Sequence, residues 1–236
     1  YLNLGNCKFK DISADAGIDG GPGIKTGVNM VDVNNDGWLD IFVCRAGPFD
    51  PQYRTKLLYI NNHNNTFTQI NGLFDNNNML SFATGDLNHD GKIDLYSTYG
   101  TVYNNSTTTD DVLWMNTTNN GNHFITFNLQ GTVSNRDALG ARVEIYGAWG
   151  KQIRECKAGD SYGNMSTYML HFGLGTATHC DSARINWPSG IVTHIVNPSV
   201  NQYINVTEGV CVSPNNVVTS SGPMVICPGS TVTLQA

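Results

Sequence analysis

Two segments of the chain, VDVNNDGWLDIFV at residues 31–43 and GDLNHDGKIDLYS at residues 85–97, repeat one pattern of oxygen-bearing side chains. In both, Asp, Asn, Asp and Asp occupy the first, third, fifth and ninth positions of a loop, and glycine occupies the sixth. The glycine marks a sharp turn that a Cβ would obstruct. Two copies at the same spacing indicate a motif and not a chance cluster.

This spacing favours a hard cation. Side chains at positions 1, 3 and 5 of a tight loop can point at one centre, a backbone carbonyl at position 7 adds an oxygen, and the carboxylate at position 9 closes the set. Calcium accepts about six to eight oxygens and tolerates irregular cages. The alternative is a turn without metal, because Asp, Asn and Gly favour turns by themselves. We predict about two calcium sites, with the ligands Asp32, Asn34, Asp36, Trp38 (carbonyl) and Asp40, and Asp86, Asn88, Asp90, Lys92 (carbonyl) and Asp94.

The residues around the two loops predict strands. An EF-hand would have Glu at position 12, whereas Val43 and Ser97 hold that place here. The flanking residues are rich in β-branched and aromatic side chains, which is typical of strands. We therefore expect each loop at the tip of a β-hairpin.

A longer repeat surrounds the loops. Three segments share an aromatic residue, an Asn two positions later, a polar turn and a strand that contains Phe; Tyr1, Tyr59 and Trp114 mark the register. The spacing of about 55 residues suits a four-stranded β unit. The calcium segments resemble FG-GAP/VCBS repeats, which are integrin-alpha-like calcium hairpins of the pattern DxDxDGxxD, with Asn here at the second Asp. The resemblance implies a partial β-propeller of about two repeats in residues 1–118, an incomplete array.

The pattern changes at about residue 119. Short segments of alternating apolar and polar residues, separated by Gly, Asn and Ser, predict an all-β sandwich or small barrel over residues 119–209. This stretch resembles the ASPIC/UnbV domain through SNRDALGARV, HFGLG and INWPSG, in that order. Residues 210–236 resemble the first strands of a Bacteroidetes-type Ig-like domain, or act as a donor tail that pairs with another surface. The predicted fold class is all-β throughout.

Cysteine usage and sequons indicate an extracellular protein, secreted or on the cell surface. The six cysteines lack CxxC spacing, which favours disulfides over zinc or redox chemistry. Fifteen pairings are open; proximity suggests Cys156 with Cys180 and Cys211 with Cys227, leaving Cys7 with Cys44. Candidate N-glycosylation sites, which an Asn- and Thr-rich surface also produces by chance, are Asn64, Asn104, Asn105, Asn116, Asn164 and Asn205.

Charge and hydropathy exclude some classes of partner. The net charge is −6, and six of the 19 acidic residues lie in the two loops, so bound calcium would account for much of the acidity. No basic patch suggests nucleic acid. No apolar run of about 18 residues predicts a membrane span.

The chain carries no catalytic motif of the GxSxG, HExxH or CxxC type, so we expect no enzyme activity. Asp137, with Arg136 and Arg142, predicts a buried ion pair that fixes a loop; the alternative is a carboxylate-binding site. The function that we expect is a calcium-stabilised structural or adhesion module, whose partners are other protein surfaces or copies of itself, head to tail in a filament. The alternative is a carbohydrate-binding module of a larger secreted protein, with glycans as ligands.

Overall fold

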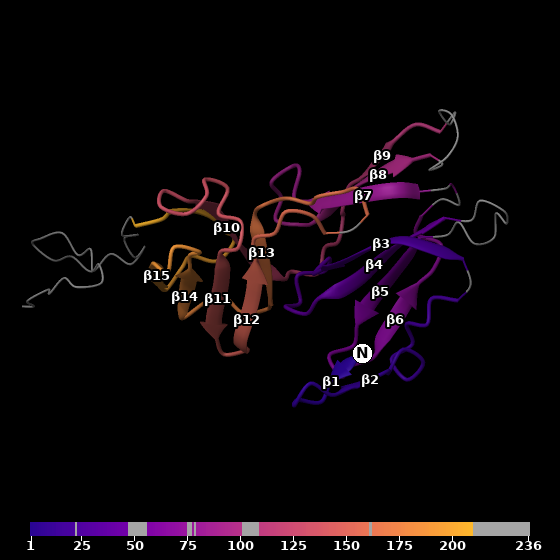
Figure 1. The fold of residues 1–236 in the computed structure, drawn as a ribbon, viewed down its shortest axis with the longest axis horizontal. Coiled ribbons are helices and arrows are strands. Elements are labelled where there is room, and N and C mark those ends of the chain that lie inside the picture. The colour runs from indigo at the N-terminus through magenta and orange to yellow at the C-terminus, as the bar shows by residue number, and fades with distance from the viewer. Residues whose placement is uncertain are drawn as a thin grey trace, which may run out of the picture. The chain divides into compact units, whose positions relative to one another are not determined.

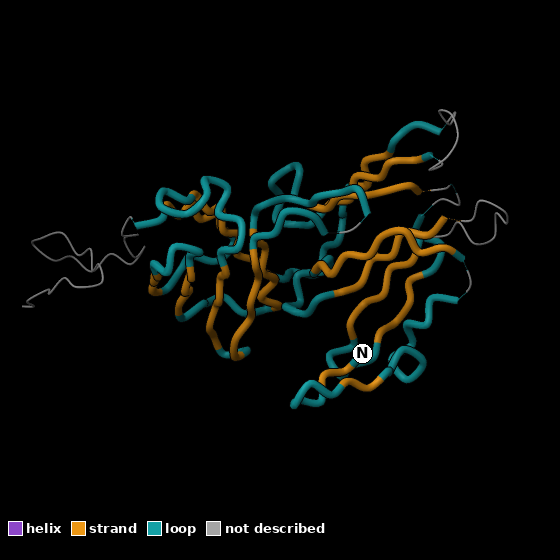
Figure 2. The backbone as a smooth tube through the Cα atoms, in the orientation of Figure 1, coloured by secondary structure: helices purple, strands orange, loops and turns teal. Residues whose placement is uncertain are grey.

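The computed structural model describes residues 1–21, 23–46, 56–74, 77, 79–100, 109–160 and 162–209. These residues form strands, turns and loops without a helix, so the predicted all-β class is confirmed (Figure 1 and Figure 2). They divide into two compact units. Unit 1 comprises Tyr1–Val33, Trp38–Thr118 and Gly159–Ser166; unit 2 comprises Asn34–Gly37, Asn119–Ala158 and the described part of Thr167–Ala236.

Unit 1 contains a two-stranded, a four-stranded and a three-stranded sheet. Their orders are β1-β2, β3-β4-β5-β6 and β7-β8-β9. The strands are β1 (Leu2–Asn3), β2 (Phe9–Lys10), β3 (Ile24–Val31), β4 (Asp40–Ala46), β5 (Leu57–Asn61), β6 (Phe67–Ile70), β7 (Met79–Gly85), β8 (Asp94–Tyr99) and β9 (Val112–Trp114).

Each acidic loop joins two antiparallel strands, as the sequence predicted. The first loop connects β3 to β4, and the second connects β7 to β8. Gly37 has φ 93° and Gly91 has φ 83°, a backbone conformation that disfavours any residue with a Cβ. Asn35 and His89, at position 4 of each loop, share φ 58°. The two loops thus share left-handed backbone conformations at positions 4 and 6.

The repeat is complete in one sheet and incomplete in the other. The β1-β2 hairpin and the β5-β6 hairpin share a register, because Asn3 lies opposite Phe9 and Asn61 lies opposite Phe67. The Phe-containing segment expected after Trp114 does not follow this scheme. It forms β10 (His123–Gln130), which belongs to a sheet of unit 2. The expectation of a complete four-stranded unit is therefore wrong for the second repeat.

Unit 1 has a small core between its two larger sheets. Phe42 of β4 contacts Phe74 and Phe82 edge to face, with ring centroids 5.4 and 4.7 Å apart. The buried members of this core are Phe42, Cys44, Leu58, Met79, Phe82, Leu95 and Tyr99. Edge-to-face packing suits the ring quadrupoles and adds specificity to the apolar burial.

Unit 2 is a two-sheet sandwich and not a closed barrel. One sheet has the order β13-β10-β16, with β10 and β16 parallel, and the other has the order β12-β11-β14-β15. The strands are β10 (His123–Gln130), β11 (Arg142–Gly147), β12 (Gly150–Glu155), β13 (Leu170–Gly175), β14 (Ser182–Asn186), β15 (Val192–Val196) and β16 (Gln202–Thr207).

Alternation along the strands of unit 2 builds its core. Ile125, Phe127 and Leu129 of β10 point into one cluster with Val143 and Ile145 of β11, and all five side chains are buried. The period of two fits strands with one face toward a core. The sequence alternation that predicted this domain therefore has a direct physical counterpart.

The predicted disulfides Cys7–Cys44 and Cys156–Cys180 are not formed; these four cysteines are free. Each buried sulfur lies against main chain instead of another sulfur: Cys44 Sγ is 3.0 Å from the Met79 carbonyl oxygen, and Cys180 Sγ is 3.3 Å from the Tyr146 carbonyl oxygen. Burial raises the pKa of the Cys156 and Cys180 thiols to about 11, so both remain protonated. Proximity in sequence was a poor guide to pairing.

The predicted ion pair at Asp137 is also wrong. Asp137 and Arg136 are exposed, and Arg142 Nη2 instead lies 2.6 Å from Glu144 Oε1 on the same strand. Some predictions fall on residues 104, 105 and 210–236, which include Cys211 and Cys227; all lie outside the described residues. Among the residues that are described, none belongs to a helix long and apolar enough to cross a membrane.

Candidate functional site

The ninth residue of each acidic loop is a buried aspartate with an identical role. Asp40 Oδ2 accepts the Val33 amide at 3.0 Å, and Asp40 Oδ1 accepts the Asn61 amide at 2.9 Å. Asp40 is fully buried. One carboxylate thus closes its own loop and ties it to the third strand of the sheet.

The second loop reproduces this arrangement. Asp94, which is 1% exposed, accepts the Leu87 amide at 3.0 Å through Oδ2 and the Asn116 amide at 2.8 Å through Oδ1. Hydrogen bonds to an ionised acceptor are stronger than those between neutral groups. The ninth position is therefore the structural anchor of both loops.

An asparagine that the metal prediction did not include completes each anchor. Asn61 Nδ2 donates to the Leu39 carbonyl at 3.0 Å, and Asn116 Nδ2 donates to the Ile93 carbonyl at 3.1 Å. Both are the Asn two positions after the aromatic residue of the repeat. That recurrence was visible in the sequence, but nothing there linked it to the loop.

The remaining oxygen-bearing side chains of the second loop face its own backbone. Asp86 accepts the amides of Asp90 (3.1 Å) and Gly91 (2.6 Å), and Asn88 Oδ1 accepts the same Asp90 amide at 3.1 Å. Positions 1 and 3 therefore converge on one side of the turn. Lys92 Nζ lies 3.4 Å from Asp90 Oδ2, so its side chain lies beside the loop.

The first loop shows a shorter version of this network. The Asp36 amide donates to Asn34 Oδ1 at 3.1 Å, and Asn34 Nδ2 donates to Asp36 Oδ2 at 2.9 Å. Asp32 is 2% exposed, and Trp38 stacks on His63 with centroids 5.0 Å apart. The Asn34 and Asp36 side chains are thus held against each other.

The oxygen atoms of the two loops are of the type that binds calcium. Carboxylate, amide and carbonyl oxygens are the ligands that calcium prefers, and a carboxylate oxygen that accepts one N–H keeps a further lone pair. Within the described ranges, no three His, Cys, Asp or Glu side chains gather as a ready-made metal group. As they stand, the loops are held together by their own amides, and the calcium prediction remains a prediction.

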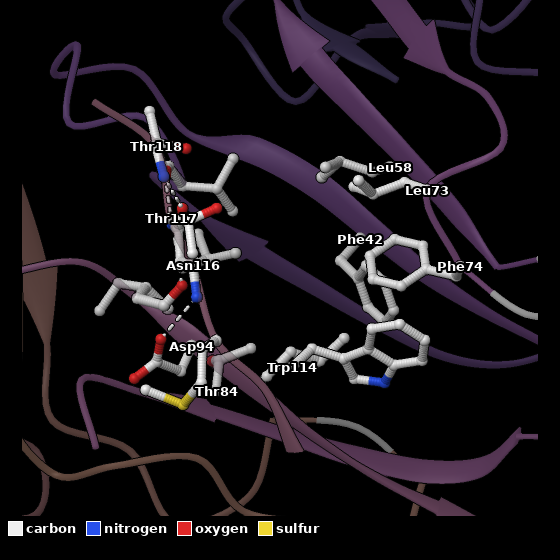
Figure 3. A pocket seen from close by; sticks show the side chains of 15 residues that line it. Phe42, Leu58, Leu73, Phe74, Thr84, Asp94, Trp114, Asn116, Thr117 and Thr118 are labelled. Carbon is white, nitrogen blue, oxygen red and sulfur yellow. Dashed lines mark hydrogen bonds between the residues drawn. The ribbon is translucent and has the colours of Figure 1, made fainter. Parts of the chain in front are cut away.

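A cavity of about 220 Å³ lies within unit 1, next to the second anchor. Figure 3 shows the rings of Phe42, Phe74 and Trp114 at one end of it and Asp94 and Asn116 at the other. Its walls are mostly apolar, and the Trp114 indole N–H is already bonded to Ser97 Oγ at 2.8 Å. The cavity therefore suits an apolar group with little polar character.

Unit 2 contains a buried carboxylate with many partners. Glu208, 1% exposed, accepts the amides of Thr132, Val133 and Ser134 at 2.9, 2.8 and 2.6 Å, and also the hydroxyls of Ser134 and Ser189. Burial alone would raise the pKa of Glu208, but these hydrogen bonds outweigh it and lower that pKa to about 2. Glu208 thereby fixes the loop that opens the SNRDALGARV segment.

His171, from the HFGLG segment, is a packing residue. Its Nδ1 lies 2.8 Å from Thr126 Oγ1, and its Nε2 lies 2.7 Å from Asn35 Oδ1, a residue of the first loop that belongs to unit 2. Burial, with the nearby charge of Arg154, lowers the pKa of His171 to about 3. The neutral ring therefore bridges two neutral partners.

The candidate glycosylation sites differ in how their amide nitrogens are used. Asn116 Nδ2 donates to two carbonyls, and Asn164 Nδ2 donates to the Phe82 carbonyl. A glycan on either nitrogen would disturb these bonds. Asn64 and Asn205 are exposed, and each uses its side-chain oxygen as an acceptor.

Comparison with known proteins bears on unit 2. Residues 131–213, about a third of the chain, match the family model described as ASPIC and UnbV, so the resemblance seen in the sequence is confirmed for this stretch. The match spans Glu208 and the loop that it holds. No curated protein matches the chain with significant similarity.

Proposed function

We propose that this chain is an extracellular, calcium-stabilised module that mediates contacts with other proteins. One observation carries the proposal: the same aspartate–asparagine anchor is built twice, at Asp40 with Asn61 and at Asp94 with Asn116. The anchors hold two loops of identical spacing, which supports a repeated role. The ASPIC and UnbV match supports it too, because that module usually occurs in extracellular proteins.

Calcium would be held by the ligand set of each loop, from Asp32 to Asp40 and from Asp86 to Asp94. The bound ion would supply positive charge among three carboxylates per loop and so remove their mutual repulsion. The loops close one end of each hairpin in unit 1. Calcium would therefore stiffen the hairpins of unit 1, while the core of the unit 2 sandwich contributes no ligand.

Protein surfaces are favoured over glycans as partners. A glycan-binding repeat presents aromatic side chains to solvent in each copy. Here two of the three repeated aromatic positions serve the sheets: Tyr59 is 2% exposed and Trp114 lines the cavity of unit 1, whereas Tyr1 is 84% exposed. Two classes of protein partner fit the proposal, a different surface protein or further copies of this chain arranged head to tail as a filament.

The test is the thermal unfolding of the full chain in calcium and in chelator. Extracellular calcium modules bind with dissociation constants of about 10⁻⁴ to 10⁻³ M, so at 10 mM calcium the gain in stability is about 1 to 3 kcal/mol for each occupied site. Asp36→Ala and Asp90→Ala should each remove part of the gain, and Asp15→Ala, an exposed acid outside the loops, should remove none. Identical melting in calcium and chelator would refute the metal assignment.

A further inference from the structure

Among the described residues, the second repeat leaves one sheet edge without a paired strand. In the first repeat, the third strand β5 has β4 on one side and β6 on the other. Its counterpart β9 pairs with β8, and no other described strand lies against it. The segment that occupies this place in the repeat has become β10 of unit 2.

The outer backbone groups of β9 can be assigned from the anchor. The Asn116 amide points to Asp94, on the β8 side. Because amides two residues apart in a strand point the same way, those of Leu113 and Met115 point away from β8. Their counterparts in the first repeat, Leu58 and Ile60, lie directly opposite Ile70 and Thr68 of β6. The same groups on β9 have no described strand to pair with.

The cavity of unit 1 adjoins this edge. Trp114, Met115 and Asn116 line it, and Leu73, 52% exposed, lies at its rim. In a strand added to this edge, the residue opposite Asn116 would place its side chain on the same face of the sheet as Trp114 and Asn116. That side chain would therefore lie at the cavity. Figure 3 shows the rings that it would meet.

The first repeat also supplies the pattern of the missing strand. In β6, Phe67 lies opposite Asn61 and Ile70 lies opposite Leu58, so an aromatic residue is followed three positions later by an aliphatic one. Phe67 is half-buried on the face of Asn61. The same antiparallel pairing on β9 places an aromatic ring opposite Asn116 and an aliphatic side chain opposite Leu113.

Charge adds a third requirement. Asp110 and Asp111 are exposed just before β9, and the Asp111 carboxylate also accepts the Tyr96 hydroxyl and the Tyr99 amide of β8. An antiparallel strand on this edge ends beside these two carboxylates. A basic residue two positions after the aliphatic one would be attracted there, most strongly at low salt.

We propose that the outer edge of β9, together with the adjoining cavity, binds an extended segment of a protein partner by strand addition. The segment runs antiparallel to β9 and carries an aromatic residue, an aliphatic residue three positions later, and then a basic residue. Main-chain bonds to Leu113 and Met115 give affinity, and the cavity gives specificity. This inference names the partner chemistry of the proposed interaction module, but it does not depend on calcium.

The first experiment measures calorimetric binding of the acetylated peptide NNTFTQINK, which is β6 with its flanking residues and an added lysine. We expect a 1:1 complex with a dissociation constant of about 10⁻⁵ to 10⁻⁴ M, in the weak range for a short peptide that must become ordered. Replacing the peptide Phe by Ala should weaken binding at least tenfold. N-methylating its backbone should abolish binding. No binding of the parent peptide, or equal binding of all three, overturns the proposal.

Two variants of the full chain locate the site. Met115→Pro removes an outward amide, and Leu73→Trp fills the mouth of the cavity from an exposed position. Both should reduce peptide affinity at least tenfold. Leu4→Trp, a similarly exposed leucine that does not line the cavity, is the matched control and should bind normally. Normal binding by Leu73→Trp with an unchanged melting temperature overturns the proposal even if Met115→Pro fails to fold.

Two further outcomes distinguish strand addition from self-association and from the calcium assignment. If the chain forms dimers that Met115→Pro dissociates, and the peptide does not bind, then a second copy covers the edge and the proposal is wrong. If peptide binding is intact but calcium has no effect on melting, only the metal assignment fails. If calcium raises the melting temperature but the peptide does not bind, the calcium-stabilised module stands and strand addition is refuted.

Discussion

The two units of the chain are stabilised by different means. Among the described residues, the core of unit 2 contains 17 buried side chains, whereas that of unit 1 contains seven. Unit 1 compensates with polar anchors, Asp40 and Asp94, whose carboxylates are almost fully buried. Where apolar burial is small, a few charge-assisted hydrogen bonds carry more of the fold.

Because the two units are stabilised by different means, they should also respond differently to metal ions and to acid. The anchors of unit 1 lie in acidic loops, so cations and changes in loop carboxylates should act there. Among its described residues, unit 2 has two buried carboxylates, Glu208 and Glu144, and a neutral histidine, His171; the pKa values of Glu208 and His171 lie at acid pH. Metal should therefore act first on the hairpins of unit 1, and protonation of Glu208 should act on unit 2.

The largest expected loss of stability comes from a substitution in the core of unit 2. Phe127 is fully buried between the two sheets and packs edge to face on Phe172 at 5.8 Å. Phe127→Ala should cost about 4 kcal/mol, because it loses burial and leaves a cavity. The indole N–H signals of Trp149 and Trp187 report unit 2, and those of Trp38 and Trp114 report unit 1.

Urea unfolding followed by NMR would show the loss. We expect only the unit 2 signals to be lost at a lower urea concentration than in the native chain. Simultaneous loss of all four signals would mean that the units unfold as one, and the comparison would then fail.

The next effect addresses unit 1. Asp40→Ala removes the acceptor for the Val33 and Asn61 amides and leaves both unpaired near a buried site, at a cost of about 3 kcal/mol. Asp94→Ala should cost about the same, since its two bonds are equivalent. Asp15→Ala, a surface acid with a partner on Lys10, should cost less than about 0.5 kcal/mol.

Urea titration of the unit 1 signals measures these costs in the presence of chelator, so that metal does not contribute. Losses below about 1 kcal/mol for both anchors, the size of one ordinary hydrogen bond, would show that the apolar core of unit 1 suffices. A loss in only one of them would show that the two repeats are not energetically equivalent.

The sequence predicted the parts of the fold that depend on local pattern. The hairpins around Gly37 and Gly91 followed from loop spacing and strand-forming flanks. The sandwich followed from alternation such as that of Ile125, Phe127 and Leu129. Both signals are properties of neighbouring residues, so they can be read without knowledge of distant contacts.

The parts that failed depend on choices between distant partners. The segment His123–Gln130 carries a pattern that suits either the fourth strand of the second repeat or a sandwich strand, and pairing with β13 and β16 decides between them. The thiols of Cys156 and Cys180 were close in sequence but lie against separate carbonyls. The anchoring role of Asn61 and Asn116 required the third strand to lie beside the loop.

The smallest of the three expected effects concerns the charge of Glu208 in unit 2, which is lost at low pH. Glu208→Gln keeps the shape but replaces a charged acceptor of five N–H and O–H groups by a neutral one, which should cost about 2 kcal/mol at pH 7. The folded pKa of about 2 lies below the ordinary value of 4.5. The charged carboxylate therefore stabilises the fold fully above pH 4.5, and this contribution is lost as the pH falls toward 2.

The gap in unfolding free energy between the native chain and Glu208→Gln should thus be constant from pH 7 to pH 5 and narrow below pH 4.5. Urea titrations at pH 7, 5, 4 and 3, read from the unit 2 indole signals, measure it. His171 destabilises unit 2 over part of this range, because its unfolded form binds a proton below about pH 6.5, but it does so equally in both proteins and cancels in the difference. A gap that stays the same down to pH 3, or that appears in the unit 1 signals, would show that Glu208 does not act through its charge on the loop that it holds.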